Sequence, residues 1–419
     1  MTTSSISQAA PYPQTVLLFD LSIYGHHATY LQYLIRYWQQ QQIAHELVIL
    51  VSPQFLTIHQ DVVELADSAT ANITFVAITL KEEENLQPRN SSLTRNLRNW
   101  QEWRLYCRYA RQLDASQSLI MYFDTYQTLL ALGQTSPCPF SAIYFRPTFH
   151  YSEFGDMTKS YKAQLQRQWE YWSLQQVLQK KRLNWLLSLD RFAVDYLKKR
   201  DAKAKVVALA DPVESTLTSA VNREQFKESL GIDKHRQVGL IFGALTPRKG
   251  IYPLLDAIKI LSPEQAEQFC LLLVGAANPI EKQRIRLEVA ALRQSCSVQI
   301  IEHYAFVSED VIPDYFKVSD IVLAPYQRHV GMSGILLLAA AAQKPVLSAD
   351  YGLMGKLVSY HQLGLTVDAS DPQAISHRLA QLVRSGVNKV GDRKMMADFA
   401  AQNNWEIFAR TIVQQMGLE

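Results

Sequence analysis

The feature that most constrains the fold is a series of short apolar runs alternating with helical apolar spacing, which occurs twice along the chain. The first run, Val16 to Asp20, ends in a turn around Gly25, and helical spacing follows through Trp38. Strands that alternate with helices form a parallel sheet covered on both faces, so two doubly wound α/β domains are predicted. The later runs are 47–51, 73–78, 119–123, 142–145, 186–189 and 206–209, then 238–242, 269–274, 298–301, 321–324, 345–347 and 365–367.

Length and composition agree with two domains that face a cleft. A chain of 419 residues exceeds one ordinary core, and 48% hydrophobic with 19% charged residues is typical of globular proteins. No apolar run is long enough to cross a bilayer. The predicted segments are a disordered tail at 1–13, a first domain at 14–208, a linker at 209–236, a second domain at 237–394 and a closing helix within 395–419.

Cysteine usage and charge indicate a cytoplasmic protein without a nucleic-acid partner. The first thirteen residues are polar and do not resemble a signal peptide. A formal net charge of +3 is too small to indicate nucleic-acid binding. Four cysteines without pair spacing favour neither a zinc site nor a disulfide framework, and these are Cys107, Cys138, Cys270 and Cys296.

The most specific segment is 242–251, which leaves an apolar strand at Phe242 and enters a helix. Backbone N–H groups and the positive end of that helix would lie beside Arg248 and Lys249, an arrangement that suits a diphosphate. The alternative is that two adjacent cations only keep a surface loop solvated.

Five segments, in this order, resemble landmarks of the C-terminal domain of retaining GT-B glycosyltransferases of family 4, or group 1: 243–250, 272–275, 318–325, 344–346 and 363–367. The linker 211–213 is similar to the family's interdomain hinge, and 395–419 to its helix that crosses back to the N-terminal domain. The resemblance implies two Rossmann-like domains and a metal-independent hexosyltransferase that acts with retention. Its donor would be a UDP or GDP sugar, with no other cofactor.

One departure from the family pattern concerns its carboxylates. The family commonly carries two glutamates, and Val330 and Leu338 stand at those positions, while Ala244 stands where arginine is frequent. In place of the glutamates lies a loop whose amides and hydroxyl are predicted to bind the donor. The remaining predicted donor-binding residues are Gly243, Gly275, Tyr304, Gly331, Met332, Ser333 and Gly334. Ser333 could instead serve only as a helix N-cap. The resemblance also implies that the loop containing Tyr304 lies against the nucleobase.

In the first half, Gly25, His26 and His27 follow the first strand, at the edge of a parallel sheet where ligands collect. Either histidine is a candidate general base or phosphate contact. Asp124 is a further catalytic candidate, and Gly25, Arg146 and His150 are acceptor-binding candidates. Packing, helix capping or an exposed turn are the structural alternatives for these residues.

Two stretches, 95–111 and 162–185, combine Arg and Lys with Trp and Tyr. They predict either contact with the inner face of a membrane or a solvated face over buried aromatics. The resulting hypothesis is sugar transfer from a nucleoside diphosphate sugar to a sugar, lipid or small-molecule acceptor, with the oligomeric state open. A catalytically degenerate nucleotide-sugar-binding or regulatory protein is the alternative, and a GT-B epimerase or phosphorylase is a third class.

Overall fold

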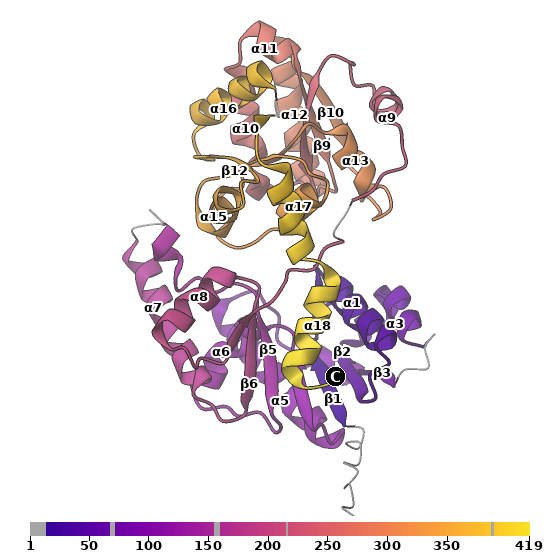
Figure 1. Cartoon of the computed structure of the whole chain (residues 1–419), viewed down its shortest axis with the longest axis vertical. Helices are drawn as coiled ribbons and strands as arrows, with labels where there is room; N and C mark the ends of the chain where they lie inside the picture. The colour runs from indigo at the N-terminus through magenta and orange to yellow at the C-terminus, as the bar shows by residue number, and fades with distance from the viewer. Residues whose placement is uncertain (1–13, 68–71, 155–159, 215–216, 387–388) are drawn as a thin grey trace, which may run out of the picture. The chain divides into compact units, whose positions relative to one another are not determined.

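The computed structural model describes residues 14–67, 72–154, 160–214, 217–386 and 389–419, so the predicted tail at 1–13 lies outside the described residues. The chain divides into two compact units (Figure 1). Unit 1 is formed by residues up to 147, by 165–209 and by 406–419, and unit 2 by 148–164 and 210–405.

Unit 1 is built on a parallel sheet of seven strands in the order β3-β2-β1-β4-β5-β6-β7. At its centre Phe19 pairs with Leu50 on one side and with Ile120 on the other. The strands are β1 (Thr15–Phe19), β2 (Glu46–Val51), β3 (Ile73–Ala77), β4 (Gln117–Ile120), β5 (Phe140–Tyr144), β6 (Leu183–Ser188) and β7 (Val206–Ala208).

The helices of unit 1 begin at side-chain caps where the sequence provides them. Ser91 and Thr94 form a capping box at the start of α5, and the Asp190 carboxylate accepts from two N–H groups at the start of α8. The helices are α1 (His27–Gln40), α2 (Pro53–Ile58), α3 (Gln60–Asp67), α4 (Leu80–Glu84), α5 (Ser92–Gln112), α6 (Phe123–Ala131), α7 (Tyr161–Leu178), α8 (Arg191–Arg200) and α18 (Trp405–Met416).

Unit 2 repeats the same design with a parallel sheet of six strands, in the order β10-β9-β8-β11-β12-β13. The strands are β8 (Gln237–Phe242), β9 (Phe269–Val274), β10 (Gln299–His303), β11 (Ile321–Ala324), β12 (Val346–Ala349) and β13 (Gly364–Val367). The helical segments are η1 (Tyr151–Phe154), α9 (Arg223–Ser229), η2 (Pro247–Lys249), α10 (Ile251–Lys259), α11 (Pro263–Glu267), α12 (Pro279–Ser295), α13 (Ile312–Val318), α14 (Ile335–Ala341), α15 (Gly352–Tyr360), α16 (Pro372–Ser385) and α17 (Arg393–Gln402).

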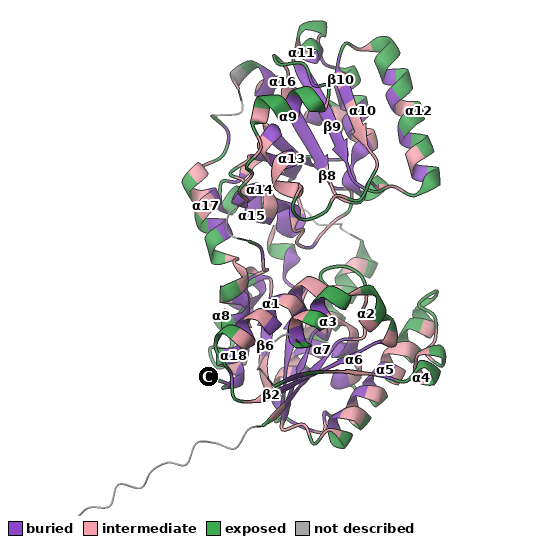
Figure 2. Ribbon diagram, turned by 90° about the vertical axis from the view of Figure 1, so that its right-hand side faces the viewer, coloured by how far each residue is buried: buried purple, intermediate pink, exposed green. Residues whose placement is uncertain are grey.

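The strands of both sheets lie in the buried interior (Figure 2). Every residue of β9 is buried, because helices cover both faces of a parallel sheet and leave no solvent face for polar residues. The predicted doubly wound α/β class is confirmed, and each predicted run overlaps a strand. Several boundaries differ: β4 ends at Ile120, so Phe123 begins α6, β6 begins already at Leu183, and β10 continues to His303.

The predicted closing helix is two helices, because two asparagines interrupt it. The Asn403 amide donates to the Phe399 carbonyl and accepts from the Asp211 N–H, and Asn404 forms a parallel bridge with Val213. These bonds replace helical ones, so α17 ends at Gln402 and α18 begins at Trp405. From Glu406 onward α18 belongs to unit 1, where Phe408 packs on Tyr30 with ring centroids 5.0 Å apart.

Gly250 and Gly231 provide a matched test of a close backbone approach in unit 2. Both residues are left-handed, with φ +75° and +71°, but a Cβ on Gly250 would lie 1.9 Å from the Pro325 carbonyl oxygen, whereas Gly231 has open space. We expect Gly231→Ala to cost about 1–2 kcal/mol of unfolding free energy. Gly250→Ala should cost more than about 3 kcal/mol because Pro325 must move. Urea unfolding measures both costs, and equal losses would show that the contact with Pro325 is unimportant.

Candidate donor and acceptor sites

Each sheet has one point where the strand order reverses, between β1 and β4 in unit 1 and between β8 and β11 in unit 2. Ligands of open α/β sheets bind at the carboxyl ends of the strands at this point, because the loops there leave in opposite directions.

In unit 2, two glycines bring the loops after β8 and β9 into contact. Gly243 has φ +94° and Gly275 has φ +141°, and a Cβ on Gly275 would lie 2.1 Å from the Gly243 carbonyl oxygen. The Gly243 N–H donates to the Val274 carbonyl at 3.0 Å. Side chains are strained at both φ values, which favours glycine at both positions. A Cβ on Gly243 would in addition lie 3.3 Å from the Lys249 Nζ.

Lys249 and Arg248 point in different directions from η2. Lys249 is 8% exposed, and its ammonium donates to the Phe242 carbonyl at 2.8 Å and to the Tyr326 hydroxyl. Because an ammonium has three N–H donors, one remains after these two bonds. Arg248 is exposed, and its Nη1 lies 3.0 Å from Nδ1 of His329. The predicted pair thus consists of one inward cation and one outward cation.

His329 holds the Arg248 guanidinium through a defined tautomer. Its Nε2 lies 3.0 Å from the Met332 carbonyl oxygen, which can only accept, so Nε2 carries the proton. Nδ1 of the neutral ring is then the acceptor for Arg248. The His329 N–H in turn donates to the Tyr351 hydroxyl, which donates to the Tyr326 carbonyl. Sequence reasoning assigned no role to His329 or Tyr326.

The start of α10 offers less to an anion than the sequence suggested. The Gly250 N–H donates to the Pro247 carbonyl, and Pro253 in the first turn has no N–H. The Gly250 backbone also lies against the Pro325 carbonyl. The two side-chain cations, rather than the helix amides, are therefore the groups at this corner best suited to bind a phosphate.

The loop before α14 lies beside the same corner. Gly331 is buried, Met332 is half-buried and holds His329, and the Ser333 hydroxyl lies 3.5 Å from the Tyr326 hydroxyl. The N-cap of α14 is Gly334, with an ordinary φ of −54°, so Ser333 is not the cap. The contacts of Tyr304 are with other residues than these. Its hydroxyl donates to Glu302, and its ring contacts Lys282 and Arg286 of α12.

In unit 1, Asp20 at the end of β1 orients His27 at the start of α1. The Asp20 side chain is 3% exposed, and its Oδ2 lies 2.5 Å from Nδ1 of His27, while Oδ1 accepts from the Ser22 N–H. The carboxylate holds the ring proton on Nδ1, which leaves Nε2 as an acceptor without a partner among the described residues. His26 is exposed and its ring stacks on Tyr30, and Gly25 makes the turn with φ +87°.

Asp124 ties α6 to the loop after β5. Its two carboxylate oxygens accept from the N–H groups of Phe145 and Arg146 at 2.9 and 3.0 Å. Burial raises the pKa of the Asp124 carboxyl to about 6, although these bonds and the Arg146 charge act to lower it. Asp124 is in the first turn of α6 and is not its N-cap, which is Tyr122.

Tyr122, which sequence reasoning missed, lies at the centre of this edge of the unit 1 sheet. Its ring centroid is 5.7 Å from that of His27 and 4.7 Å from that of Phe145. Burial and the Asp124 charge raise the pKa of Tyr122, and the charge of Arg146 acts to lower it. Arg146 is exposed.

His150 is 1% exposed and belongs to unit 2, where its ring makes edge contacts with Phe149, Tyr151 and Phe154. This environment favours the packing alternative over acceptor binding. No signal in the sequence distinguishes such a buried aromatic cluster from a ligand-binding one.

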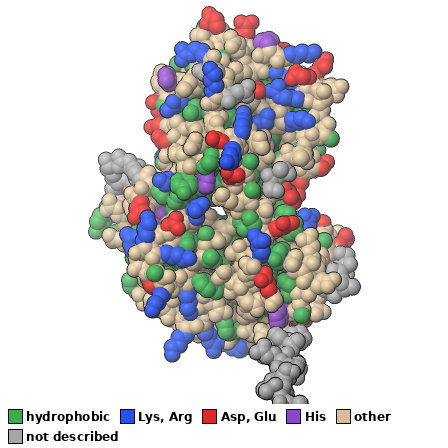
Figure 3. All heavy atoms as spheres, viewed as in Figure 1, with side chains coloured by type: hydrophobic (Ala, Val, Ile, Leu, Met, Phe, Trp, Pro, Cys, Tyr) green, Lys and Arg blue, Asp and Glu red, His purple; other side chains and the backbone are tan. Residues whose placement is uncertain are grey.

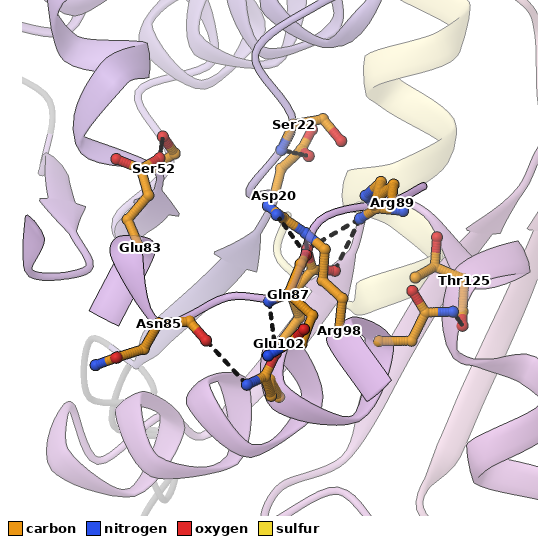
Figure 4. Close-up of polar contacts among 12 residues, drawn as sticks. Asp20, Ser22, Ser52, Glu83, Asn85, Gln87, Arg89, Arg98, Glu102 and Thr125 are labelled. Carbon is orange, nitrogen blue, oxygen red and sulfur yellow. Dashed lines mark hydrogen bonds and ion pairs between the residues drawn. The ribbon is translucent and has the colours of Figure 1, made fainter. Parts of the chain in front are cut away.

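Unit 1 also contains a buried carboxylate, that of Glu102, which contacts α6. Glu102 of α5 is 2% exposed and accepts from Arg89 and Arg98, as Figure 4 shows, and from the Tyr126 hydroxyl at 3.1 Å. Asp20 follows Phe19, whose ring centroid lies 5.8 Å from that of Tyr126. Burial raises the pKa of Tyr126, and the charges of Glu102 and Asp20 raise it further.

The aromatic and basic stretches place some rings in the core and others at the surface. Trp103 and Tyr106 of α5 are buried, whereas Trp100 is 37% exposed beneath Arg104. Figure 3 shows lysine and arginine side chains gathered at the lower end of unit 1. Within the described residues, no helix has the length and apolar content needed to span a bilayer, and no three His, Cys, Asp or Glu residues are grouped to hold a metal ion.

The raised pKa of Asp124 predicts a pH-dependent cost to folding. With a folded pKa of about 6 against an ordinary 3.8, the native state holds its proton longer, so stability falls as pH rises from about 4 to about 6. Relative to Asp124→Asn, the wild type should lose about 1–3 kcal/mol across this window. Paired unfolding curves at pH 4, 5, 6 and 7 measure the difference, and a flat difference would contradict a raised pKa.

Comparison with known proteins relates the second half of the chain to one family. Residues 236–385 match the family model described as glycosyl transferases group 1. An uncharacterized glycosyltransferase of Methanocaldococcus jannaschii is 22% identical over 181 residues, which are 43% of this chain and 48% of that protein. A phosphatidyl-myo-inositol mannosyltransferase of Mycobacterium leprae is 25% identical over 173 residues, 40% of this chain and 42% of that protein. The matches thus span just under half the length of these two relatives.

Among solved structures, Anabaena HepE in complex with UDP and glucose superposes with a TM-score of 0.61 at 15% identity, covering 96% of this chain and 98% of that one. At this identity the likeness concerns the fold. The two parallel sheets, each with its reversal of strand order, agree with it. Residues 236–385 thus resemble the group 1 glycosyltransferases, and the chain has the GT-B fold.

Proposed function

We propose that the chain transfers a sugar from a nucleoside diphosphate sugar to an acceptor hydroxyl, with the donor bound in unit 2 and the acceptor in unit 1. The observation that carries this proposal is the Arg248–His329 and Lys249–Tyr326 pairing where β8 and β11 end. Nucleotide-sugar donors are typical of the family, and the HepE structure contains UDP and glucose.

The chemical problem in such a transfer is the negative charge that builds on the leaving diphosphate. The acceptor oxygen bonds to the anomeric carbon as the bond from that carbon to the phosphate oxygen breaks, and its electron pair stays with the diphosphate. Arg248 presents an exposed guanidinium, already oriented by His329, and Lys249 retains one N–H donor. Cations positioned before the reaction stabilise this charge more in the transition state than in the bound donor.

The acceptor hydroxyl must also lose a proton, and His27 is suited to receive it. The Asp20 carboxylate holds Nδ1, so Nε2 is available as a base and the resulting imidazolium is stabilised. His26 has no such carboxylate in its described bonds and stacks on Tyr30. This difference favours His27 over His26 in the proposed role.

Retention of the anomeric configuration is part of the proposal on family grounds alone. The anomeric configuration of the first product formed, measured by proton NMR from the coupling constant of its anomeric hydrogen, distinguishes retention from inversion. Donor binding without turnover in the presence of any acceptor would instead support the nucleotide-sugar-binding or regulatory alternative, and isomerisation of the donor sugar without acceptor would support an epimerase.

The donor role of the corner predicts a graded loss on mutation. Arg248→Gln should lower kcat/KM for the donor about 10- to 100-fold, since a hydrogen bond to a charged group contributes about 1.5–3 kcal/mol. His329→Ala should cost less, because it frees the guanidinium without removing it. Release of nucleoside diphosphate is measured across UDP, GDP and ADP sugars.

Arg384→Gln, at an exposed position on α16, is the matched control and should leave kcat/KM unchanged. If Arg248→Gln behaves like Arg384→Gln with every nucleotide sugar that binds, the donor site does not lie at this corner.

The proposed base predicts a separation of kcat from KM. His27→Gln should lower kcat about 10²- to 10⁴-fold while the donor KM changes little, because the histidine acts on the acceptor proton. Asp20→Asn should give a smaller fall, since the ring stays but loses its orienting carboxylate. His26→Gln provides the comparison, and a fall in kcat there as large as for His27→Gln would contradict the assignment.

A further inference from the structure

Two exposed guanidinium groups flank Tyr122 at the carboxyl edge of the unit 1 sheet. Arg146 directly follows Phe145, whose ring stacks on that of Tyr122 with centroids 4.7 Å apart. Arg89 binds Glu102, which accepts from the Tyr126 hydroxyl, and Tyr126 lies one helical turn after Tyr122. Burial raises the pKa of Tyr122, and the charges of both arginines act to lower it. The Arg89 side chain is 47% exposed. In its described bonds only Nη2 of Arg89 is used, so its other N–H groups are open to a ligand.

The acidic groups around these arginines are turned inward. Glu102 is 2% exposed and is covered by Arg98 and Tyr126 as well as by Arg89 (Figure 4). Asp124 gives both oxygens to backbone N–H groups, and Asp20 is held by His27 and the Ser22 N–H. These three carboxylates are thus bound to protein groups, whereas the guanidinium groups of Arg89 and Arg146 reach solvent.

Two half-buried aromatic rings, Tyr122 and Phe145, lie beside His27. The rings of Tyr122 and Phe145 stack with centroids 4.7 Å apart, and Phe145 stacks on Tyr30 at 5.8 Å. The ring of His27 is 5.7 Å from Tyr122 and 6.4 Å from Phe145. Stacked rings of this kind present an apolar face to a ligand that has both apolar and polar surface, as a sugar does.

We propose that unit 1 takes an acceptor that carries an anionic group, either a phosphate or a carboxylate, on the sugar next to the hydroxyl that is glycosylated. Arg89 and Arg146 bind the anion, and Tyr122 and Phe145 contact the ring. A guanidinium can donate two parallel N–H bonds to a pair of oxygens in either a carboxylate or a phosphate, which is why the two anions share one recognition chemistry. This inference rests on the proposed function for the transfer itself, but binding of the anion does not require turnover.

The first experiment measures binding by the full chain without donor. Isothermal titration calorimetry uses three matched probes: glucose, glucose 6-phosphate and glucuronate. We expect at least one anionic probe to bind 10-fold or more tightly than glucose, and the better of the two identifies the anion. Equal affinity for all three probes, or no binding of either anionic probe at concentrations where glucose binds, would overturn the proposal.

The variants separate a specific site from general positive charge. Arg146→Gln should not disturb folding, because the backbone N–H at position 146 still donates to Asp124. This variant should bind the anionic probes no more than about 3-fold more tightly than glucose. Arg89→Gln should do the same, with Glu102 still held by Arg98 and Tyr126. Arg200→Gln is the matched control, because Arg200 ends α8, which leads to the amino end of β7 at the opposite edge of the sheet. A loss of preference in Arg200→Gln as large as in Arg146→Gln would refute a local site.

A transfer assay distinguishes failure of this inference from failure of the proposed function. With a nucleotide sugar that the chain turns over, the same three probes serve as acceptors, and the anionic preference should appear in kcat/KM. Turnover with equal preference for neutral and anionic acceptors overturns the anion site and leaves transferase activity intact. Selective anion binding without turnover of any nucleotide sugar leaves the site intact and counts against the proposed activity.

Discussion

The bond from the Lys249 ammonium to the Tyr326 hydroxyl is the contact on which the unit 2 site depends. It joins the segment after β8 to the segment after β11, the two loops that part where the strand order reverses. Lys249 also holds the Phe242 carbonyl, so the end of β8, η2 and the loop before α14 are fixed relative to one another. A buried ammonium requires such partners, because its desolvation is otherwise costly. With the loops fixed in this way, Arg248 and His329 meet at 3.0 Å.

The same topological position in unit 1 carries a different chemistry. There a carboxylate at the end of β1 orients an imidazole, and aromatic rings from the ends of β4 and β5 lie beside it. One unit thus presents cations where its strand order reverses, and the other presents an imidazole held by a carboxylate, aromatic rings and two arginines. In the proposed reaction, in which one substrate leaves as an anion and the other gives up a proton, this division suits the two substrates. Similar sheets with different loop residues at their reversal points would then carry the two proposed roles.

The sheets and the residues that gather after β8 could be predicted from the sequence, whereas their polar partners could not. Apolar runs such as Phe269 to Val274 indicate buried strands, since a parallel sheet covered on both faces excludes polar residues. Gly243 and Arg248 were predicted from their place after such a strand. The sequence analysis included Asp20 in the first strand and gave it no role. A carboxylate at the end of a strand, seven positions before His27, is the signal that could have indicated their contact. Tyr122 and His329 carry no pattern of their own, because their neighbours are distant in sequence.

What the sequence by itself determined is the order of strands and helices, the two-domain α/β class and the positions where chain reversals place loops at a ligand-binding edge. Local periodicity and turn residues carry that information, because they act over a few residues. Only the tertiary structure decided that Lys249 faces inward and Arg248 outward, that His27 has the carboxylate, that Asp124 is bound to backbone N–H groups and that His150 is packed among aromatic rings. The reason is that burial and hydrogen-bond partners are supplied by residues that folding brings together from distant parts of the chain.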